Sequence, residues 1–105
     1  MNQLAQQSLA KFGVTIQTIG ITNNKELTQE IINKFYTKHV CADWGDLPQE
    51  DKEQNMEVLK KENGGNIYSV YKYKNIKFWI ITSGYGNDPK DINMCYTTIL
   101  LPNEY

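Results

Sequence analysis

The sequence predicts an α+β domain in which two helices pack on an antiparallel sheet. Apolar residues recur at helical spacing in two segments, at about 24–38 and 48–61. Runs rich in aromatic and β-branched residues follow and predict a three-stranded C-terminal meander, with strands at 66–73, 76–82 and 94–101. A segment at 12–19 adds an N-terminal strand. Helices and strands grouped in this way, without regular alternation, are typical of α+β proteins.

Length and composition allow one such domain. The chain has 105 residues, of which 40% are hydrophobic and 22% are charged, as is ordinary for a single globular unit. We divide it into a polar, Gln-rich N-terminal segment at 1–11 and a single α+β domain at 12–105. The longest wholly apolar run, at 78–81, is far shorter than the roughly 20 residues of a membrane helix. The N-terminus has no basic and apolar leader, so a cytoplasmic protein without membrane contact is expected.

The N-terminal half supplies the first strand and the first helix. The segment at 12–19 alternates β-branched and polar side chains, which is the period-two pattern of a half-buried strand. Side-chain oxygens at 22–24 can cap a helix that starts at about residue 24. One apolar stripe marks this helix and consists of Leu27, Ile31, Ile32 and Phe35. Because they occupy inward positions, we expect Ile31 and Phe35 to be buried.

The second helix is delimited by its charges. Pro48 is tolerated in a first turn, acidic residues crowd the start, and two lysines end the segment at Lys61. The sequence Asn-Gly-Gly at 63–65 then stops the helix. The helix is therefore expected at 48–61.

The predicted meander is apolar on both faces. Lys74 and Asn75 join its first two strands, and a loop dense in turn formers at 83–91 precedes the third. Alternation assigns one face to Tyr68, Val70, Trp79, Ile81, Ile99 and Leu101, and the opposite face to Ile67, Tyr71, Ile76, Phe78, Ile80 and Leu100. Two helices can cover one face, so we expect the other to bind a protein partner or to form a homodimer through the sheet. Trp44 and Trp79 are expected to be largely buried.

The segment at 39–55 concentrates the side chains that could carry chemistry. It holds the only His, one of the two Trp and three of the Asp residues around the connection between the predicted helices. Four-residue steps bring His39 to the inner end of the first helix. The same spacing brings Asp51 and Asn55 to an apolar face of the second helix, where polar groups need partners. The candidate binding residues are His39, Asp43, Trp44, Asp46, Asp51 and Asn55.

Two interpretations of this segment are open. In the catalytic one, His39 is an acid or base that a neighbouring Asp carboxylate orients, and Trp44 lines the pocket of a small hydrolase or nuclease. In the structural one, Asp43 or Asp46 accepts backbone N–H bonds at the start of the second helix. His39 then caps the first helix and Trp44 fills the core. We favour the structural interpretation, because such carboxylate spacing is common in acidic turns.

Charge argues against a broad nucleic-acid interface. All 11 basic residues are Lys, and Arg, the side chain best suited to bidentate recognition of phosphate and guanine, is absent. The net charge is −1. Lys72, Lys74 and Lys77 form one basic patch beside the first hairpin, and aromatic residues of the meander could stack bases, which leaves a single-stranded nucleic-acid-binding module as an alternative. These aromatic residues are Tyr68, Tyr71, Tyr73, Trp79, Tyr85 and Tyr96.

The two cysteines indicate neither a disulfide nor a metal site. Cys41 and Cys95 are 54 positions apart, and the chain has no Cys-x-x-Cys motif. Four zinc ligands would need more than two Cys and one His. Two free thiols are therefore expected, and no metal or other cofactor is predicted.

From the segment at 39–55 onwards, the chain resembles a family of small proteins found on bacterial plasmids and integrative conjugative elements. The resemblance covers about residues 35–105. It rests on ordered blocks, which are His39, 43–47, Asp51 and Asn55, then Tyr71 and 79–82, and finally 97–105. Ala42 stands where Gly is expected in relatives, and the 83–95 segment replaces a shorter connection. The resemblance implies a mobile-element setting and carries no catalytic activity over.

From this setting we expect an accessory protein of a mobile genetic element that binds another macromolecule, such as a host defence or regulatory protein. The small hydrolase or nuclease and the single-stranded nucleic-acid-binding module are the alternatives.

Overall fold

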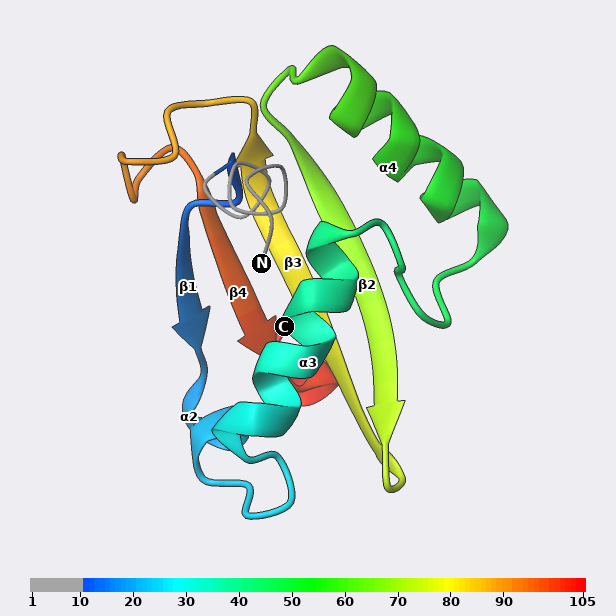
Figure 1. Ribbon diagram of the computed structural model, residues 1–105, viewed down its shortest axis with the longest axis vertical. Helices are drawn as coiled ribbons and strands as arrows, with labels where there is room; N and C mark the ends of the chain where they lie inside the picture. Colours follow the sequence, from blue (N-terminus) through cyan, green and yellow to red (C-terminus); the bar gives the residue numbers. More distant parts are fainter. Residues whose placement is uncertain (1–10) are drawn as a thin grey trace.

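The computed structural model describes residues 11–105 and confirms the α+β class (Figure 1). The expected N-terminal segment at 1–11 lies outside the described residues except for Lys11. The strands are β1 (Val14–Gln17), β2 (Gly65–Tyr73), β3 (Ile76–Tyr85) and β4 (Tyr96–Leu100). The helices are α2 (Ile19–Thr22), α3 (Gln29–Val40) and α4 (Gln49–Lys61), and a 3-10 turn, η1 (Pro102–Glu104), follows β4.

The four strands form one mixed sheet in the order β1-β4-β3-β2. Strands β2, β3 and β4 are the predicted antiparallel meander, whereas β1 pairs with β4 in parallel. After β1 the chain crosses by way of α3 to the far edge of the sheet (Figure 1). Three strands of alternating direction then bring β4 back beside β1 with the same direction. The sheet differs from the predicted one in this pairing, in the phase of β4 and in the length of β3, which continues through residues 83–85 where a loop was expected.

Helix α3 begins five residues after the expected start. Its N-cap is Thr28, whose hydroxyl oxygen accepts the backbone N–H of Ile31 at 3.3 Å. The oxygen of Asn24 instead accepts the N–H of Glu26 at 3.0 Å within a turn, and Thr22 ends α2. Side-chain oxygens stabilise turns and helix starts through the same bonds, so the sequence offered two equivalent starting points.

The side chains of β4 point to the opposite faces of the sheet from those expected, so the phase of this strand is reversed. Leu100 pairs with Trp79 and Ile99 pairs with Ile80, so Leu100 shares the face of Trp79 and Ile99 faces the core. The assignment of Ile99 to the Trp79 face, and of Leu100 to the opposite face, is therefore wrong by one residue. The run Ile-Leu-Leu carries no polar residue that could set its phase, and the pairing with β3 sets it instead.

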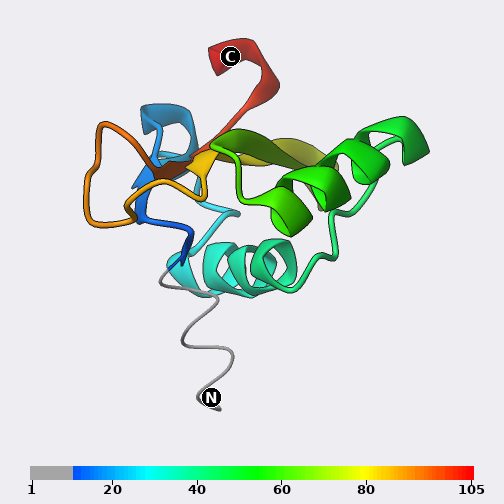
Figure 2. The same cartoon turned by 90° about the horizontal axis from the view of Figure 1, so that it is seen from above.

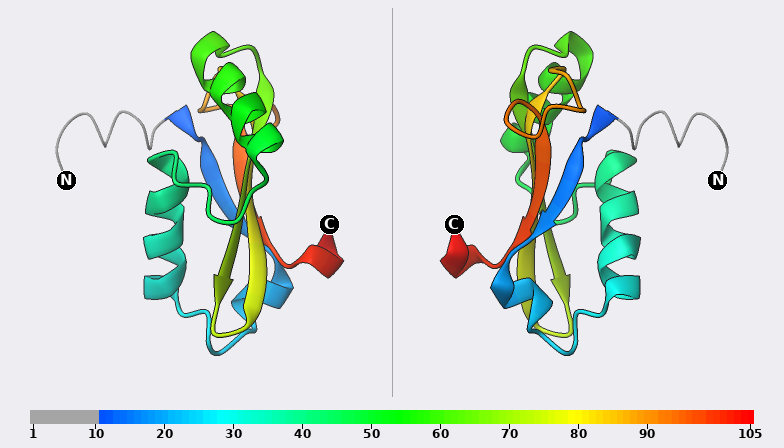
Figure 3. Two further views of the ribbon diagram at one scale, coloured as in Figure 1. Left: turned by 90° about the vertical axis from the view of Figure 1, so that its right-hand side faces the viewer. Right: turned by 90° about the vertical axis from the view of Figure 1, so that its left-hand side faces the viewer.

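Helix α3 covers one face of the sheet, and η1 lies on the opposite side (Figure 2 and Figure 3). The core between α3 and the sheet contains Ile21, Leu27, Ile32, Tyr71, Phe78, Ile80 and Ile99. Helix α4 packs beside β2 at the edge of the sheet. A second cluster gathers Phe12, Trp44, Leu47, Ile67 and Tyr85.

Burial of the predicted core residues is mixed. Trp44 is 6% exposed, which confirms its place in the core. Ile31 and Phe35 are only partly buried against the main cluster, because Ile32 takes the innermost position of α3. Trp79 is also only partly buried, since its face of β3 is covered by the short η1 turn and Tyr105 and not by a long helix such as α3 (Figure 2).

Candidate functional site

The segment at 39–55 runs along the outer edge of β2. Gly45 forms a parallel bridge with Val70. The N–H of Asp46 donates to the carbonyl oxygen of Val70 at 2.8 Å, and the N–H of Val70 donates to the carbonyl oxygen of Trp44 at 3.1 Å. Edge strands expose unpaired backbone groups, and these two hydrogen bonds satisfy the N–H and the carbonyl oxygen of Val70.

Gly45 is required by this close approach. Its φ is +67°, a left-handed conformation that favours glycine. A Cβ atom at this position would collide with the carbonyl oxygen of Val70 and press on the ring of Tyr71. The glycine of the Asp-Trp-Gly-Asp sequence is therefore explained by the left-handed backbone conformation and by the close approach to β2.

Asn55 continues the same edge. Its Nδ2 donates to the carbonyl oxygen of Tyr68 at 2.8 Å, and its Oδ1 accepts the N–H of Tyr68 at 3.0 Å. The side-chain amide thus takes the place of a neighbouring strand, and Asn55 is 1% exposed. The sequence argument that Asn55 needs polar partners is confirmed, with the partners on β2.

His39 lies inside the molecule, between α3 and the sheet. Its Nδ1 is 2.6 Å from Ser69 Oγ, and its Nε2 is 2.8 Å from Thr82 Oγ1. Thr82 Oγ1 is in turn 2.8 Å from Thr97 Oγ1, and Thr97 donates to the carbonyl oxygen of Phe12 at 2.7 Å. Burial lowers the pKa of His39 from 6.5 to about 3, so the ring is neutral at pH 7.

The three aspartates do not join His39. Asp43 is exposed and forms an ion pair of 3.6 Å with Lys38, and its main-chain oxygen accepts the hydroxyl of Tyr71 at 2.5 Å. Asp46 and Asp51 are also exposed, while His39 is 1% exposed and uses both ring nitrogens on hydroxyls. No acid–base pair between His39 and a carboxylate is assembled within the described residues.

The structural interpretation is only partly accurate in its details. Trp44 fills the core as expected. Helix α4 has Pro48 at its N-cap and no side-chain cap bond, so neither Asp43 nor Asp46 caps it; Asp43 instead accepts the N–H of Gly45 at 3.5 Å. His39 bonds to the sheet rather than capping α3. Proline with extended backbone geometry starts a helix without a side-chain acceptor, because its missing N–H leaves one donor fewer to satisfy.

Within residues 11–105, no three His, Cys, Asp or Glu side chains are grouped as ligands for a metal ion. Cys41 is exposed and Cys95 is buried, and both are free.

The face of the sheet opposite α3, here called the open face, is largely apolar. Trp79, Ile81 and Leu100 occupy its middle, and Tyr68 and Val70 lie beside them on β2. On the other edge, Val14 is 45% exposed and Ile16 is 39% exposed. The η1 turn and Tyr105 stand over this face, and α2 lies on the same side of the sheet at the end of β1 (Figure 2 and Figure 3).

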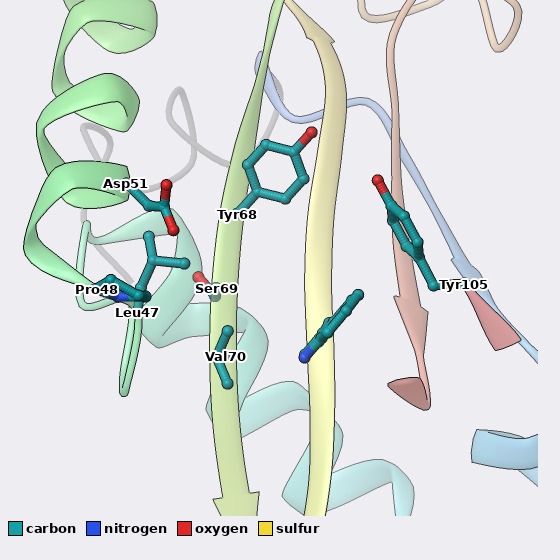
Figure 4. Close-up of a pocket in the computed structure, with 8 residues that line it drawn as sticks. Leu47, Pro48, Asp51, Tyr68, Ser69, Val70 and Tyr105 are labelled. Atoms are coloured by element: carbon teal, nitrogen blue, oxygen red, sulfur yellow. The ribbon is translucent and has the colours of Figure 1, made fainter. Parts of the chain in front are cut away.

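A groove of about 430 Å³ crosses the open face (Figure 4). Its lining consists of Leu47, Pro48, Asp51, Tyr68, Ser69, Val70, Trp79 and Tyr105. The ring of Tyr105 packs edge-on against Trp79, with the ring centroids 5.1 Å apart and the planes at 68°. Asp51 is the only predicted site residue in this lining. The groove unites it with aromatic residues of β2, β3 and the C-terminus.

Sequence reasoning missed Tyr105 and Pro48 as members of this surface. Tyr105 follows the last strand and belongs to no periodic pattern, so nothing local indicates that it turns back over Trp79. Pro48 carried a signal for a helix start only. Val14 and Ile16 did carry a signal, because the alternation at 12–19 predicts one apolar face of a strand. The alternation does not predict that this apolar face would join the open face.

The chain matches no protein-family model, and no curated protein and no solved structure matches it. The functional argument therefore depends on the site itself.

Among residues 11–105, no helix combines the length and the apolar character needed to cross a lipid bilayer.

Proposed function

We propose that the protein is an accessory protein of a mobile genetic element, and that it acts by binding another protein through the open face. A host defence or regulatory protein is the kind of partner that this setting suggests. The resemblance of the blocks at 39–55 and 97–105 to plasmid and conjugative-element proteins supports the setting. The open face supports the mode of action.

The apolar character of the open face is the observation that carries the proposal. Val14 and Ile16 are 45% and 39% exposed at the β1 edge of this face, whereas Ile81 and Leu100 in its middle are buried. Tyr105 adds an aromatic residue that is 74% exposed. Contiguous apolar surface on a folded domain marks interaction sites, and aromatic residues are enriched in the centres of such interfaces.

The segment at 39–55 then has a supporting role. It satisfies the edge of β2 through Trp44, Asp46 and Asn55, and it brings Leu47 and Asp51 to the border of the open face. His39 anchors α3 to β2 and β3 from inside. Under this proposal the residues of the segment build the binding surface, and Asp51 is the one that faces the partner.

A single-stranded nucleic-acid module is a second candidate that one observation favours. Lys72 and Lys77 are directly opposite each other in the β2–β3 pairing and share the open face with Tyr68, Trp79 and Tyr96. Single-strand binders combine stacking aromatics with a positive groove. Here the groove is lined by the carboxylate of Asp51 and by no lysine, so we favour a protein partner.

Site-specific photo-crosslinking in cells tests the proposal. A photoreactive residue replaces Ile16 on the open face, and a matched variant carries it at Lys34, an exposed position of α3. We expect a discrete protein adduct from position 16 and none from position 34. The adducted protein, once purified, should bind the unmodified chain and should bind a Val70→Glu variant much more weakly.

Three outcomes would contradict the proposal. They are equal adducts from both positions, an adduct with nucleic acid, and an adduct of two copies of this chain alone. The last would assign the open face to a homodimer. The setting has its own test, because genes for conjugation or recombination should flank the coding sequence.

A further inference from the structure

We infer that the groove on the open face receives a Lys or Arg side chain from the protein partner. The inference rests on the proposed function and specifies the chemistry of the contact. It depends on a juxtaposition that the fold creates, in which three aromatic rings and one carboxylate line the same groove.

The aromatic rings form the floor and one wall. Tyr68 lies on β2 next to the Val70–Trp79 pair, and diagonal neighbours in an antiparallel sheet are within reach of aromatic side chains. Tyr105 and Trp79 form a T-shaped pair with their ring centroids 5.1 Å apart, and the residue Tyr105 is 74% exposed. The faces of Trp and Tyr rings attract ammonium and guanidinium groups, with Trp the strongest.

The carboxylate of Asp51 stands on the other side of the groove. Asp51 lies in the first turn of α4 and its side chain is directed towards Tyr68 (Figure 4). Within residues 11–105 it forms no ion pair, whereas Glu57 of the same helix is paired with Lys61 at 3.1 Å. An incoming cation can therefore bind Asp51 without displacing an internal partner.

The apolar border of the groove suits the stem of a long basic side chain. Leu47 and Pro48 lie beside Asp51 (Figure 4), and Val70 on β2 is paired with Trp79 on β3. Lys and Arg bury their methylene stems on apolar surface and direct the charged end to a polar group. A partner phosphate would instead meet the charge of Asp51 at close range.

Amino-acid amides serve as probes for the test. Nα-acetyl-lysine amide and its uncharged counterpart Nα-acetyl-norleucine amide have similar stems and differ in the ammonium group. Each is titrated into the protein while NMR follows the indole N–H of Trp79 and the ring of Tyr105, and Trp44 serves as an internal reference. We expect saturable shifts with the lysine probe and at least five-fold weaker binding of the norleucine probe.

Two α4 variants assign the charge contribution. Asp51→Asn should weaken the binding of the lysine probe at least five-fold and leave the binding of the norleucine probe unchanged. Glu53→Gln is the matched control, because Glu53 is exposed on α4 and does not line the groove, and it should bind both probes as the original chain does. The spectra of both variants report directly whether they are folded.

Failure of this inference is distinguishable from failure of the proposed function. Equal affinity for the two probes, or no shift at Trp79 and Tyr105, overturns the cation site. Stronger shifts of the same signals with a short oligothymidylate also overturn it. If the crosslinked partner from position 16 persists in either case, the open face still binds a protein, but through contacts other than a basic side chain.

Discussion

The buried His39 side chain links the stability of this protein to the pH of the solution. His39 is bonded to Ser69 and Thr82 as a neutral ring, and protonation would place an unpaired charge where the side chain is 1% exposed. A residue that resembles a catalytic base in the sequence is therefore a link between α3 and two strands.

The first prediction concerns the pH dependence of stability. Burial lowers the pKa of His39 to about 3 from 6.5, so between these pH values the unfolded chain binds more protons than the folded chain. Stability should be complete above about pH 6.5 and should decrease as the pH falls, by about 1 kcal/mol or more per pH unit near pH 5. Urea unfolding at intervals between pH 5 and 7.5 measures this.

His39→Gln is the control for this prediction. The variant should have a lower free energy of unfolding at pH 7, and this free energy should be nearly independent of pH above 5, because the variant lacks the buried imidazole that binds a proton only in the unfolded chain. A wild-type stability that stays constant from pH 7 to pH 5 would show that the His39 ring accepts a proton without unfolding.

A second residue-scale prediction concerns Asn55. Asn55→Ala leaves the N–H and the carbonyl oxygen of Tyr68 without the partners now at 3.0 and 2.8 Å. The free energy of unfolding should fall by about 2–4 kcal/mol, since each buried group that loses its bond costs about 1–3 kcal/mol. Gln54→Ala, at the exposed neighbouring position, should change it by less than about 0.5 kcal/mol. Similar losses in the two variants would contradict the role of Asn55.

At the scale of elements, β3 is a strand with two unequal apolar faces. Phe78 is fully buried under α3, whereas Trp79 is partly buried on the open face. Phe78→Ala should cost about 3–5 kcal/mol of unfolding free energy, and Trp79→Ala should cost roughly half of that or less. Thermal or denaturant unfolding of the two variants distinguishes the faces. A larger cost at Trp79 would mean that the open face is covered in the free protein.

At the scale of the whole molecule, the face of the sheet under α3 is covered, whereas the opposite face leaves Val14 and Ile16 exposed at the β1 edge and buries Ile81 and Leu100 in its middle. Ile16→Ser should therefore separate stability from binding. Because Ile16 is 39% exposed, the free energy of unfolding should change by less than about 1 kcal/mol, while the yield of the partner adduct from a photoreactive residue at Val70 should fall severalfold. Thr37→Ser on α3 is the control and should alter neither. A large loss of stability in Ile16→Ser would show that β1 belongs to the core.

The local sequence determined most of the secondary structure. The charge distribution and Pro48 predicted α4 to within a residue, and the two-residue connection at Lys74 and Asn75 was predicted correctly. These features depend on neighbours within a few positions, so periodicity and turn chemistry are sufficient to predict them.

The tertiary structure alone decided which polar groups meet and which face stays open. The hydroxyls that bond to His39 are 30 and 43 positions away from it, and the backbone groups that bond to Asn55 belong to another element. The phase of β4 came from its pairing with β3, and the position of Tyr105 from the turn after Leu100. Pairing over such separations depends on register and on long-range packing, and these leave no periodic trace in a single sequence.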